Sequence, residues 1–518
     1  MSLGAPRDPG APARHAPDFR LEGRRTPIEL EPDDFARIGH RLVDDVAELL
    51  RTMRDRPLAP GETPAEIRAA LHAARGLPRE GSDAGQVLAE ATELLLEHSL
   101  FNGHPRFFGY ITSGAAPLGM LGDLLASAVN PNVGAWTLSP MATEIETQTV
   151  RWIAELVGFP SGGGGVLASG GNVANMLAFW AARAARAGWD VRDTGLKGEG
   201  AATLRAYASA ATHTWIQKAA DLSGMGTSSI RWIETDAAGR IRPDALRRSI
   251  EADIADGDAA LMVVGTAGSV STGAVDPLPA LREICDEHGL WLHVDGAYGA
   301  FAAAAPNAPA DLAGVALADS VALDPHKWLY APLEAGCVLV RDPVALLAAF
   351  SYHPDYYHLE EQASNYFEQG LQNSRGFRAL KVWLLLRHIG RDGYARMIAE
   401  DIELARRFHE IAHEHAELEA FTHGLSITTY RYVPPDLAQR ARDVAVAEYL
   451  NALNQAVQDR MEKSGRAFVS NAVLEGVHAL RMCIVNFRTT LEDVVALADI
   501  TVELGRAADR ELRPAALG

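Results

Sequence analysis

The chain has few cysteines for its length of 518 residues. Its three cysteines, Cys285, Cys337 and Cys483, lie far apart in the sequence and form no Cys-x-x-Cys motif. A disulfide framework is therefore not indicated, and a reducing compartment is the simpler interpretation. We predict a cytoplasmic protein without a metal site.

Positive charge is also scarce. The 48 lysines and arginines are outnumbered by 67 aspartates and glutamates, which gives a formal net charge of −19. A surface this acidic repels phosphate backbones and anionic lipid head groups. We therefore expect neither nucleic acid nor a membrane as a partner.

Long hydrophobic runs are missing as well. No uninterrupted apolar run approaches the roughly 20 residues that a transmembrane helix needs. Residues 1–25 are rich in proline, glycine and arginine but contain no hydrophobic stretch of the signal-peptide type. We expect a disordered tail there, with an organellar transit segment as the alternative.

Two common nucleotide-binding motifs are absent. Neither Gly-x-Gly-x-x-Gly nor Gly-x-x-x-x-Gly-Lys-Ser/Thr occurs, so dinucleotide and P-loop sites have little support. The chain is nevertheless long enough for two or three domains with a large core.

Helical patterns dominate the N-terminal part of the chain. Apolar residues recur at helical spacing over 33–55, and a further helix is predicted over 82–99. Between them, Thr63, Pro64 and Glu66 form the pattern of a capping box with proline at the first helical position.

From residue 165 onward, short apolar runs alternate with helical stretches. This alternation predicts an α/β fold with a mainly parallel sheet of seven strands, covered on both faces. Ligands of such sheets bind beyond the carboxyl ends of the strands. A long helix is predicted after residue 376, followed by a smaller α+β unit. The apolar runs are 166–168, 206–208, 230–233, 260–266, 290–295, 320–323 and 337–340.

Two ionisable residues stand at the ends of apolar runs of this region, because Asp295 ends the run 290–295 and Lys327 comes shortly after the run 320–323. Burying a charge is costly, so the pair indicates a site. Taken singly, Asp295 is compatible with a helix cap and Lys327 with a solvated side chain. Together they are what pyridoxal phosphate (PLP) requires, because an amine forms a Schiff base with its aldehyde and a carboxylate keeps its pyridine nitrogen protonated.

Three further motifs accompany this pair. The glycine-rich turn 168–175 precedes a helix whose N-terminus suits a phosphate, and His213 offers an imidazole that can stack on a flat ring. Segment 265–277 brings small hydroxyl residues to the end of a buried strand, where they can contact a ring oxygen or a phosphate. Each motif also has a purely structural interpretation, as a turn or a helix cap.

With these motifs in order, the chain resembles the group II PLP-dependent amino acid decarboxylases, and most closely the aromatic-L-amino-acid decarboxylases. The resemblance covers nearly the whole chain. It implies a PLP-dependent transferase-like fold of type I and a homodimer. The matching stretches are His-Pro-Arg-Phe-Phe (104–108), Ser-Pro-Met-Ala-Thr-Glu-Ile-Glu (139–146), Ser-Gly-Gly-Asn-Val-Ala-Asn (169–175), His213, His-Val-Asp-Gly-Ala-Tyr (293–298), Asp-Pro-His-Lys (324–327) and Phe-Arg-Ala-Leu-Lys-Val-Trp (377–383).

The resemblance also divides the chain into domains. After the tail, residues 26–116 form a helical segment that packs on the partner subunit. Residues 117–375 form the large PLP-binding domain, and residues 376–518 form the small C-terminal α+β domain.

For the cofactor ring, the resemblance implies five contacts. Lys327 forms the Schiff base, and Asp295 pairs with the pyridine N–H. His213 stacks on one face of the ring, with Ala297 against the other, and Thr266 lies near the ring hydroxyl.

For the phosphate, the resemblance implies Gly171 and Asn172, with help from Asp324 or His326. Family members often carry asparagine or serine at the position of Asp324. A carboxylate beside a phosphate is repulsive, so a direct contact by Asp324 is not expected.

Two positions concern the reaction and the substrate carboxylate. Tyr356 is the best match to the family's proton donor to the substrate carbanion, and its neighbour Tyr357 is the alternative. Arg481 matches an arginine that binds the substrate α-carboxylate in glutamate-type members, and a structural strand arginine is the other interpretation.

The substrate pocket is expected to be aromatic. Phe107, Phe108, Tyr110 and Trp136 fall in stretches that line the pocket in this family, and Gly134 replaces a frequent phenylalanine, which suggests extra room. We predict decarboxylation of tryptophan, tyrosine or phenylalanine. The alternative substrates within the family are glutamate and a sulfinic amino acid. The alternative activities, from the most to the least favoured, are an aldehyde synthase, a cofactor-free binding protein and a nicotinamide dehydrogenase.

Overall fold

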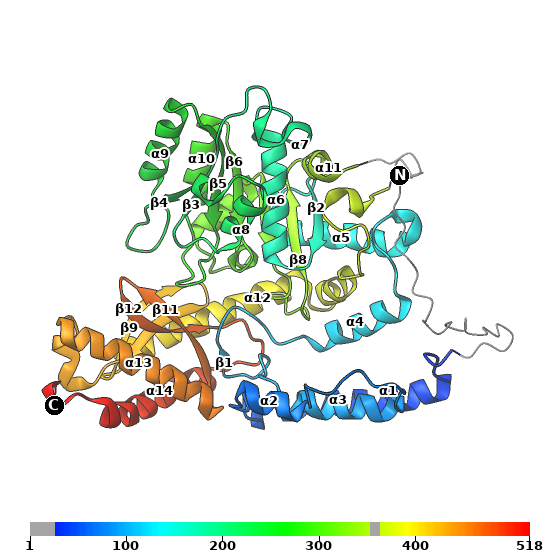
Figure 1. The fold of residues 1–518 in the computed structure, drawn as a ribbon. Coiled ribbons are helices and arrows are strands. Elements are labelled where there is room, and N and C mark those ends of the chain that lie inside the picture. Colours follow the sequence, from blue (N-terminus) through cyan, green and yellow to red (C-terminus); the bar gives the residue numbers. More distant parts are fainter. Residues whose placement is uncertain (1–25, 353–362, 518) are drawn as a thin grey trace, which may run out of the picture.

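The computed structural model describes residues 26–352 and 363–517. Its centre is a seven-stranded sheet in the order β2-β8-β7-β6-β5-β3-β4 (Figure 1). The strands β7, β6, β5, β3 and β4 run parallel to one another. Strand β8 is antiparallel to both of its neighbours, β7 and β2. The predicted fold class is therefore confirmed. The strands are β2 (Gly164–Ala168), β3 (Leu204–Ser209), β4 (Ile230–Ile233), β5 (Ala259–Thr266), β6 (Trp291–Asp295), β7 (Ser320–Leu323) and β8 (Gly336–Val340).

Helices cover both faces of this sheet. Along β8, Val338 packs in a cluster with α6 and α8, whereas Cys337 and Leu339 pack in a second cluster with α5, α9 and α10. Because side chains of a strand alternate between the two faces, an apolar run without polar residues requires cover on both. The helices are α5 (Pro140–Val157), α6 (Gly171–Arg186), α8 (Trp215–Leu222), α9 (Pro243–Ala255) and α10 (Leu278–His288), with the short α7 (Val191–Thr194) and α11 (Val344–Phe350).

A second sheet of five strands has the order β1-β11-β12-β10-β9. Its outer strand β1 comes from the N-terminal part of the chain and runs parallel to β11, whereas the other neighbours are antiparallel. The sequence did not predict β1 or β9 as strands. The elements are β1 (Phe107–Phe108), β9 (Leu418–Gly424), β10 (Ile427–Tyr432), β11 (Phe468–Leu474) and β12 (Val477–Cys483), with α13 (Val444–Ser464) and α14 (Leu491–Leu512).

The long helix α12 (Ala379–Glu414) lies between the two sheets (Figure 1). It contacts α5 of the large sheet at one end and β9 and β10 of the small sheet at the other. Its helical geometry is interrupted at Gly390, which has a φ of 72°. This left-handed conformation suits glycine, which has no Cβ to clash.

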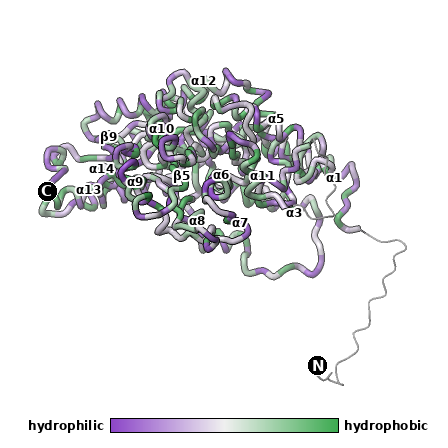
Figure 2. The backbone as a smooth tube through the Cα atoms, turned by 90° about the horizontal axis from the view of Figure 1, so that it is seen from above, coloured by the Kyte–Doolittle hydropathy of each residue, from purple (hydrophilic) through white to green (hydrophobic). Residues whose placement is uncertain are grey.

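The N-terminal helices form a separate layer. They are α1 (Pro32–Thr52), α2 (Pro64–Ala70) and α3 (Ala84–His98), and none of their residues is buried. The predicted capping box of Thr63 and Glu66 is confirmed. Seen from above, α1 and α3 lie at the end of the molecule opposite to α13 and α14 (Figure 2).

Helix α4 (Pro117–Val129) follows the N-terminal layer and packs on α12. Among the residues that the structure describes, no helix combines the length and the apolar composition that crossing a bilayer requires.

Candidate active site

The predicted site residues of the large sheet meet at the carboxyl ends of its parallel strands. Asp295 ends β6 and is the register partner of Thr266, the last residue of β5. Lys327 lies in the turn after β7, the strand next to β6. The expected edge of the sheet therefore carries these three side chains together.

Asp295 is buried and accepts two N–H groups. The indole Nε1 of Trp215 donates to Oδ2 at 2.7 Å, and the backbone N–H of Ala297 donates to Oδ1 at 3.3 Å. No ion pair to this carboxylate exists in residues 26–352 and 363–517. Asp295 is thus oriented by two hydrogen bonds, and no cation among the described residues occupies it. Sequence reasoning missed Trp215, although it stands two positions after His213.

Lys327 forms an ion pair with Asp324. The two atoms, Nζ and Oδ2, are 2.9 Å apart, and the carboxylate is almost completely buried. The second oxygen of Asp324, Oδ1, is buried and has no hydrogen-bond partner. The carboxylate therefore contacts the lysine amine, and its unpaired oxygen leaves room for another donor in the site.

The N-terminus of α6 lies against this pair. A Cβ on Gly171 would come within 2.7 Å of Asp324 Oδ2 and 2.9 Å of Ala297 Cβ, so only glycine fits. Gly170, which precedes the helix, has a φ of 153° and lies beside His326. The first N–H groups of a helix lack intrahelical acceptors and attract an anion. The predicted phosphate turn thus faces the lysine turn.

The remaining predicted contacts lie around this centre. His213 is exposed just before α8, and its Nδ1 accepts the backbone N–H of Trp215 at 3.3 Å. Burial lowers the pKa of His326, whose Nδ1 lies 2.6 Å from the carbonyl oxygen of Ala335. Asn172 is half-buried and has its Nδ2 3.7 Å from Met176 Sδ.

Thr266 is held by a buried carboxylate that sequence reasoning missed. Its backbone N–H donates to Asp276 Oδ2 at 2.7 Å, and Ile241 donates to the other oxygen. Burial raises the pKa of Asp276 to about 6. The Thr266 hydroxyl lies 3.5 Å from that of Thr212, so both face the same space.

A buried layer beneath the site connects two of the matching motifs. His293 of β6 has Nε2 2.7 Å from Asn175 Oδ1 of α6 and Nδ1 2.8 Å from Ser320 Oγ of β7. Burial lowers the pKa of His293 to about 4, so the ring is neutral and can donate from one nitrogen only. This contact fixes the phosphate turn relative to the strand that ends in Asp295.

The predicted substrate residues form two groups. In the small sheet, Arg481 is buried and its Nη2 donates to the carbonyl oxygen of Tyr110 at 2.6 Å, whereas its Nε has no partner. Tyr110 is 62% exposed, and Phe107 is buried against Phe468 with 5.2 Å between ring centroids. Phe107 therefore contributes to a hydrophobic cluster. Trp136 is half-buried elsewhere, and its Nε1 donates to Glu144.

The extra room expected at Gly134 is not present. A Cβ there would lie 2.2 Å from the carbonyl oxygen of Asn373, because the chain fills this space with backbone. The predicted proton donors Tyr356 and Tyr357, and the tail 1–25, lie outside the described residues.

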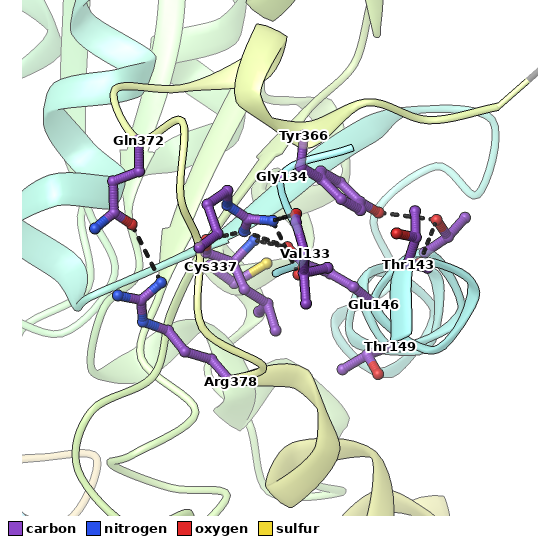
Figure 3. Close-up of polar contacts among 12 residues, drawn as sticks. Val133, Gly134, Thr143, Glu146, Thr149, Cys337, Tyr366, Gln372 and Arg378 are labelled. Carbon is purple, nitrogen blue, oxygen red and sulfur yellow. Dashed lines mark hydrogen bonds and ion pairs between the residues drawn. The ribbon is translucent and has the colours of Figure 1, made fainter. Parts of the chain in front are cut away.

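A buried ion pair fixes the chain around Gly134 (Figure 3). Arg375 contacts Glu146 of α5 through both Nη atoms, at 2.5 and 3.1 Å. It also donates to the carbonyl oxygens of Val133 and Leu167, while the backbone N–H of Leu167 donates to Glu146. Glu146 comes from a motif of the sequence, whereas Arg375 was missed.

Comparisons with known proteins identify the family of the chain. The family described as "Pyridoxal-dependent decarboxylase conserved domain" matches residues 66–429. The aromatic-L-amino-acid decarboxylase of Bacillus atrophaeus is 30% identical over 475 residues, which cover 91% of this chain and 95% of that protein. Phenylacetaldehyde synthase of Petunia hybrida is 30% identical over 491 residues, with 90% and 93% covered.

Solved structures show the same architecture. Oryza sativa TDC with PLP and tryptamine aligns with a TM-score of 0.85 and 26% identity, covering 95% of this chain and all 100% of that one. This likeness confirms the expected PLP-dependent transferase-like fold of type I.

Proposed function

The chain belongs to the pyridoxal-dependent decarboxylase family, and from this membership we propose that it converts an aromatic L-amino acid to the amine and CO2. As a member it is a carbon–carbon lyase with PLP as its cofactor. Tryptophan, tyrosine and phenylalanine are the proposed substrates. The observation that carries the proposal is the meeting of Lys327, Asp295 and the N-terminus of α6 at one edge of the sheet.

The residues at this edge fit PLP. The amine of Lys327 is available for the aldehyde, and the carboxylate of Asp295 has no cation of its own among the described residues. The side-chain-free Gly171 leaves a cradle at the start of α6. Asp324 contacts the lysine amine, and we do not assign it to the phosphate. We assign cofactor binding to Gly171, Asn172, His213, Thr266, Asp295, Ala297, His326 and Lys327.

When bound, PLP supplies an electron-accepting ring that stabilises the electron pair left on the substrate α-carbon as CO2 departs. Asp295 holds the proton at the pyridine nitrogen. The N–H groups of Trp215 and Ala297 keep its two oxygens oriented, so little reorganisation is needed during the reaction. Asp324 holds the Nζ of Lys327 in the site when that amine is free.

Arg481 is the proposed contact of the substrate carboxylate. It is buried, and no carboxylate pairs with it in the part of the chain that the structure describes. Since an unpaired buried guanidinium is unfavourable, an incoming anion would be attracted to it. Tyr356 is the proposed proton donor to the α-carbon, and Tyr357 is its alternative.

The test is an assay of the PLP-loaded protein with tryptophan, tyrosine, phenylalanine and glutamate. We expect equimolar amine and CO2 from an aromatic substrate, and loss of both cofactor retention and turnover in Lys327→Ala. Consumption of glutamate with the aromatics ignored would overturn the substrate assignment. Retention of turnover in Lys327→Ala would overturn the proposed function itself.

An aldehyde synthase is the second candidate, because the petunia relative is as similar to this chain as the bacterial decarboxylase. Such an enzyme releases ammonia and hydrogen peroxide together with CO2. Measuring peroxide in the same assay separates the two activities, and we expect none.

The proposed assembly is a homodimer in which the N-terminal layer packs on a second copy. Helices α1, α2 and α3 bury no residue within their own chain, and Phe35 and Leu95 are 60% and 65% exposed. Apolar surface of this extent is covered in stable proteins. A reducing cytoplasmic location is consistent with three cysteines that are all buried and free.

A further inference from the structure

The turn that carries Lys327 has a strained backbone. Tyr330, three positions later, has a φ of 54°, in the left-handed region that tyrosine rarely adopts. Its N–H donates to the carbonyl oxygen of Lys327 at 3.0 Å, and its own carbonyl oxygen accepts the N–H of Ala116 at 2.9 Å. A strained residue persists only where its surroundings hold it in place.

A buried aspartate of α12 provides such a hold. Asp401 Oδ2 accepts the indole N–H of Trp328 at 2.8 Å and the hydroxyl of Tyr330 at 2.9 Å. Both donors are fully buried, and both lie within three positions after Lys327 in the sequence. No lysine or arginine pairs with Asp401 in the described part of the chain. Its hydrogen-bonding capacity is thus directed at the lysine turn.

Neighbouring contacts tie the same turn to the rest of the site. The hydroxyl of Tyr394, also on α12, donates to the carbonyl oxygen of Leu329 at 3.0 Å. The Trp328 indole stacks on Tyr298 with 4.8 Å between centroids, and Tyr298 lies three positions after Asp295. The hydroxyl of Tyr298 in turn lies 2.7 Å from Ser426 Oγ in the small domain.

We propose that Asp401 is a positioning residue, which fixes the direction of Lys327 by holding Trp328 and the strained Tyr330 on α12. This inference rests on the proposed role of Lys327 as the cofactor lysine. Asp401 forms its hydrogen bonds with Trp328 and Tyr330 and not with Lys327 itself. Its effect reaches the amine through the backbone of one short turn, where a small displacement is costly for the reaction.

The test compares three variants of the PLP-loaded protein. Tyr330→Phe removes the hydrogen bond from the Tyr330 hydroxyl to Asp401. Asp401→Leu removes the oxygen that accepts the hydrogen bonds from Trp328 and Tyr330, and Asp401→Asn keeps an oxygen that can accept these two bonds. For the first two we expect a shifted absorbance band of bound PLP, a PLP dissociation constant raised about tenfold or more, and kcat lowered by up to about 100-fold with little change in KM. Asp401→Asn should stay near the wild type.

The matched control is Tyr430→Phe, which removes a buried tyrosine hydroxyl bonded to Thr501 at 3.2 Å in the small domain. It should lower the unfolding temperature without altering the PLP spectrum, PLP affinity or kcat. If Asp401→Leu does not fold, Tyr330→Phe decides. A wild-type spectrum, affinity and kcat in Tyr330→Phe, or equal changes in the control, overturns the proposal. Lys327→Ala tests the cofactor lysine separately, because its result does not depend on Asp401.

Discussion

Trp215 orients Asp295, the carboxylate that we assign to the pyridine nitrogen of the cofactor. The hydrogen bond from its indole N–H is the shorter of the two that this carboxylate accepts. A hydrogen bond to a charged group contributes about 1.5–3 kcal/mol. We therefore expect Trp215→Phe to lower kcat by about 10- to 100-fold and to change the absorbance of bound PLP.

The control for this substitution is Trp383→Phe. The Trp383 indole N–H donates to Gln148 at 2.7 Å on the other side of the large sheet, between α12 and α5. The same chemical change there should leave kcat and the PLP spectrum at wild-type values. Equal losses of kcat in both variants would show that Trp215 acts through general stability.

Individual site residues were predictable where they follow a pattern along the chain. Asp295 and Lys327 each follow an apolar run, and Gly171 lies in a glycine-rich turn. Trp215 and Asp401 follow no such pattern, because their roles arise only from tertiary contacts. Asp401 accepts a hydrogen bond from Trp328, which lies 73 positions earlier in the sequence. The sequence does not determine how α12, the helix that carries Asp401, is oriented toward Trp328.

The elements around Gly134 depend on the ion pair between Arg375 and Glu146. The two side chains are 3% and 1% exposed, and they connect α5 with the end of β2 and the backbone at Val133. Removing one partner leaves a buried charge uncompensated, which costs about 3–5 kcal/mol. We expect Arg375→Met to lower the free energy of unfolding by that amount in urea titrations.

Adding Glu146→Leu to that variant should restore part of the loss, since an apolar pair no longer buries a charge. A double variant less stable than Arg375→Met would instead mean that the hydrogen bond from the Leu167 N–H to Glu146, which Glu146→Leu also removes, outweighs the relief of the buried charge.

Helix α12 carries a group whose titration affects stability. Burial raises the pKa of Asp401 to about 7, although the bonds from Trp328 and Tyr330 oppose the shift. Because the folded pKa exceeds the unfolded one, its stabilising contribution is full below about pH 4 and is lost as the pH rises through 7. Relative to Asp401→Asn, the wild type should therefore lose up to about 1.4 kcal/mol per pH unit in this window.

Urea unfolding of both proteins at pH 5, 6, 7 and 8 measures this difference. Plotted against pH, the free energies of unfolding of the wild type and of Asp401→Asn should converge or cross toward pH 7 and run parallel above it. Parallel curves across the whole range would show that Asp401 stays ionised in the folded protein.

Among the elements, the parallel strands were predictable, whereas β1 and β9 were not. The strands of the large sheet are apolar on both faces, which gives a continuous signal. Strand β1 has two residues and exists through its pairing with β11, with Phe107 opposite Phe468. A contact between segments so far apart leaves no local pattern.

At the scale of the whole molecule, one apolar face of α4 stays exposed in the part of the chain that the structure describes. Gly119 and Gly122 bring this helix against α12, and a Cβ at Gly119 would lie 2.5 Å from Pro332. On this helix, Leu121 and Leu124 are 54% and 55% exposed. This face extends the surface that we assign to a second copy.

Charges on that face should separate the subunits. In Leu121→Asp/Leu124→Asp we expect a monomer by light scattering, since burying two carboxylates in an apolar interface is strongly unfavourable. The control Leu222→Asp changes a leucine that is 68% exposed on α8 and should remain dimeric. A wild-type protein that is monomeric at micromolar concentration would refute the dimer. A double variant that stays dimeric would instead confine the interface to α1–α3, whose apolar residues could then be replaced in turn.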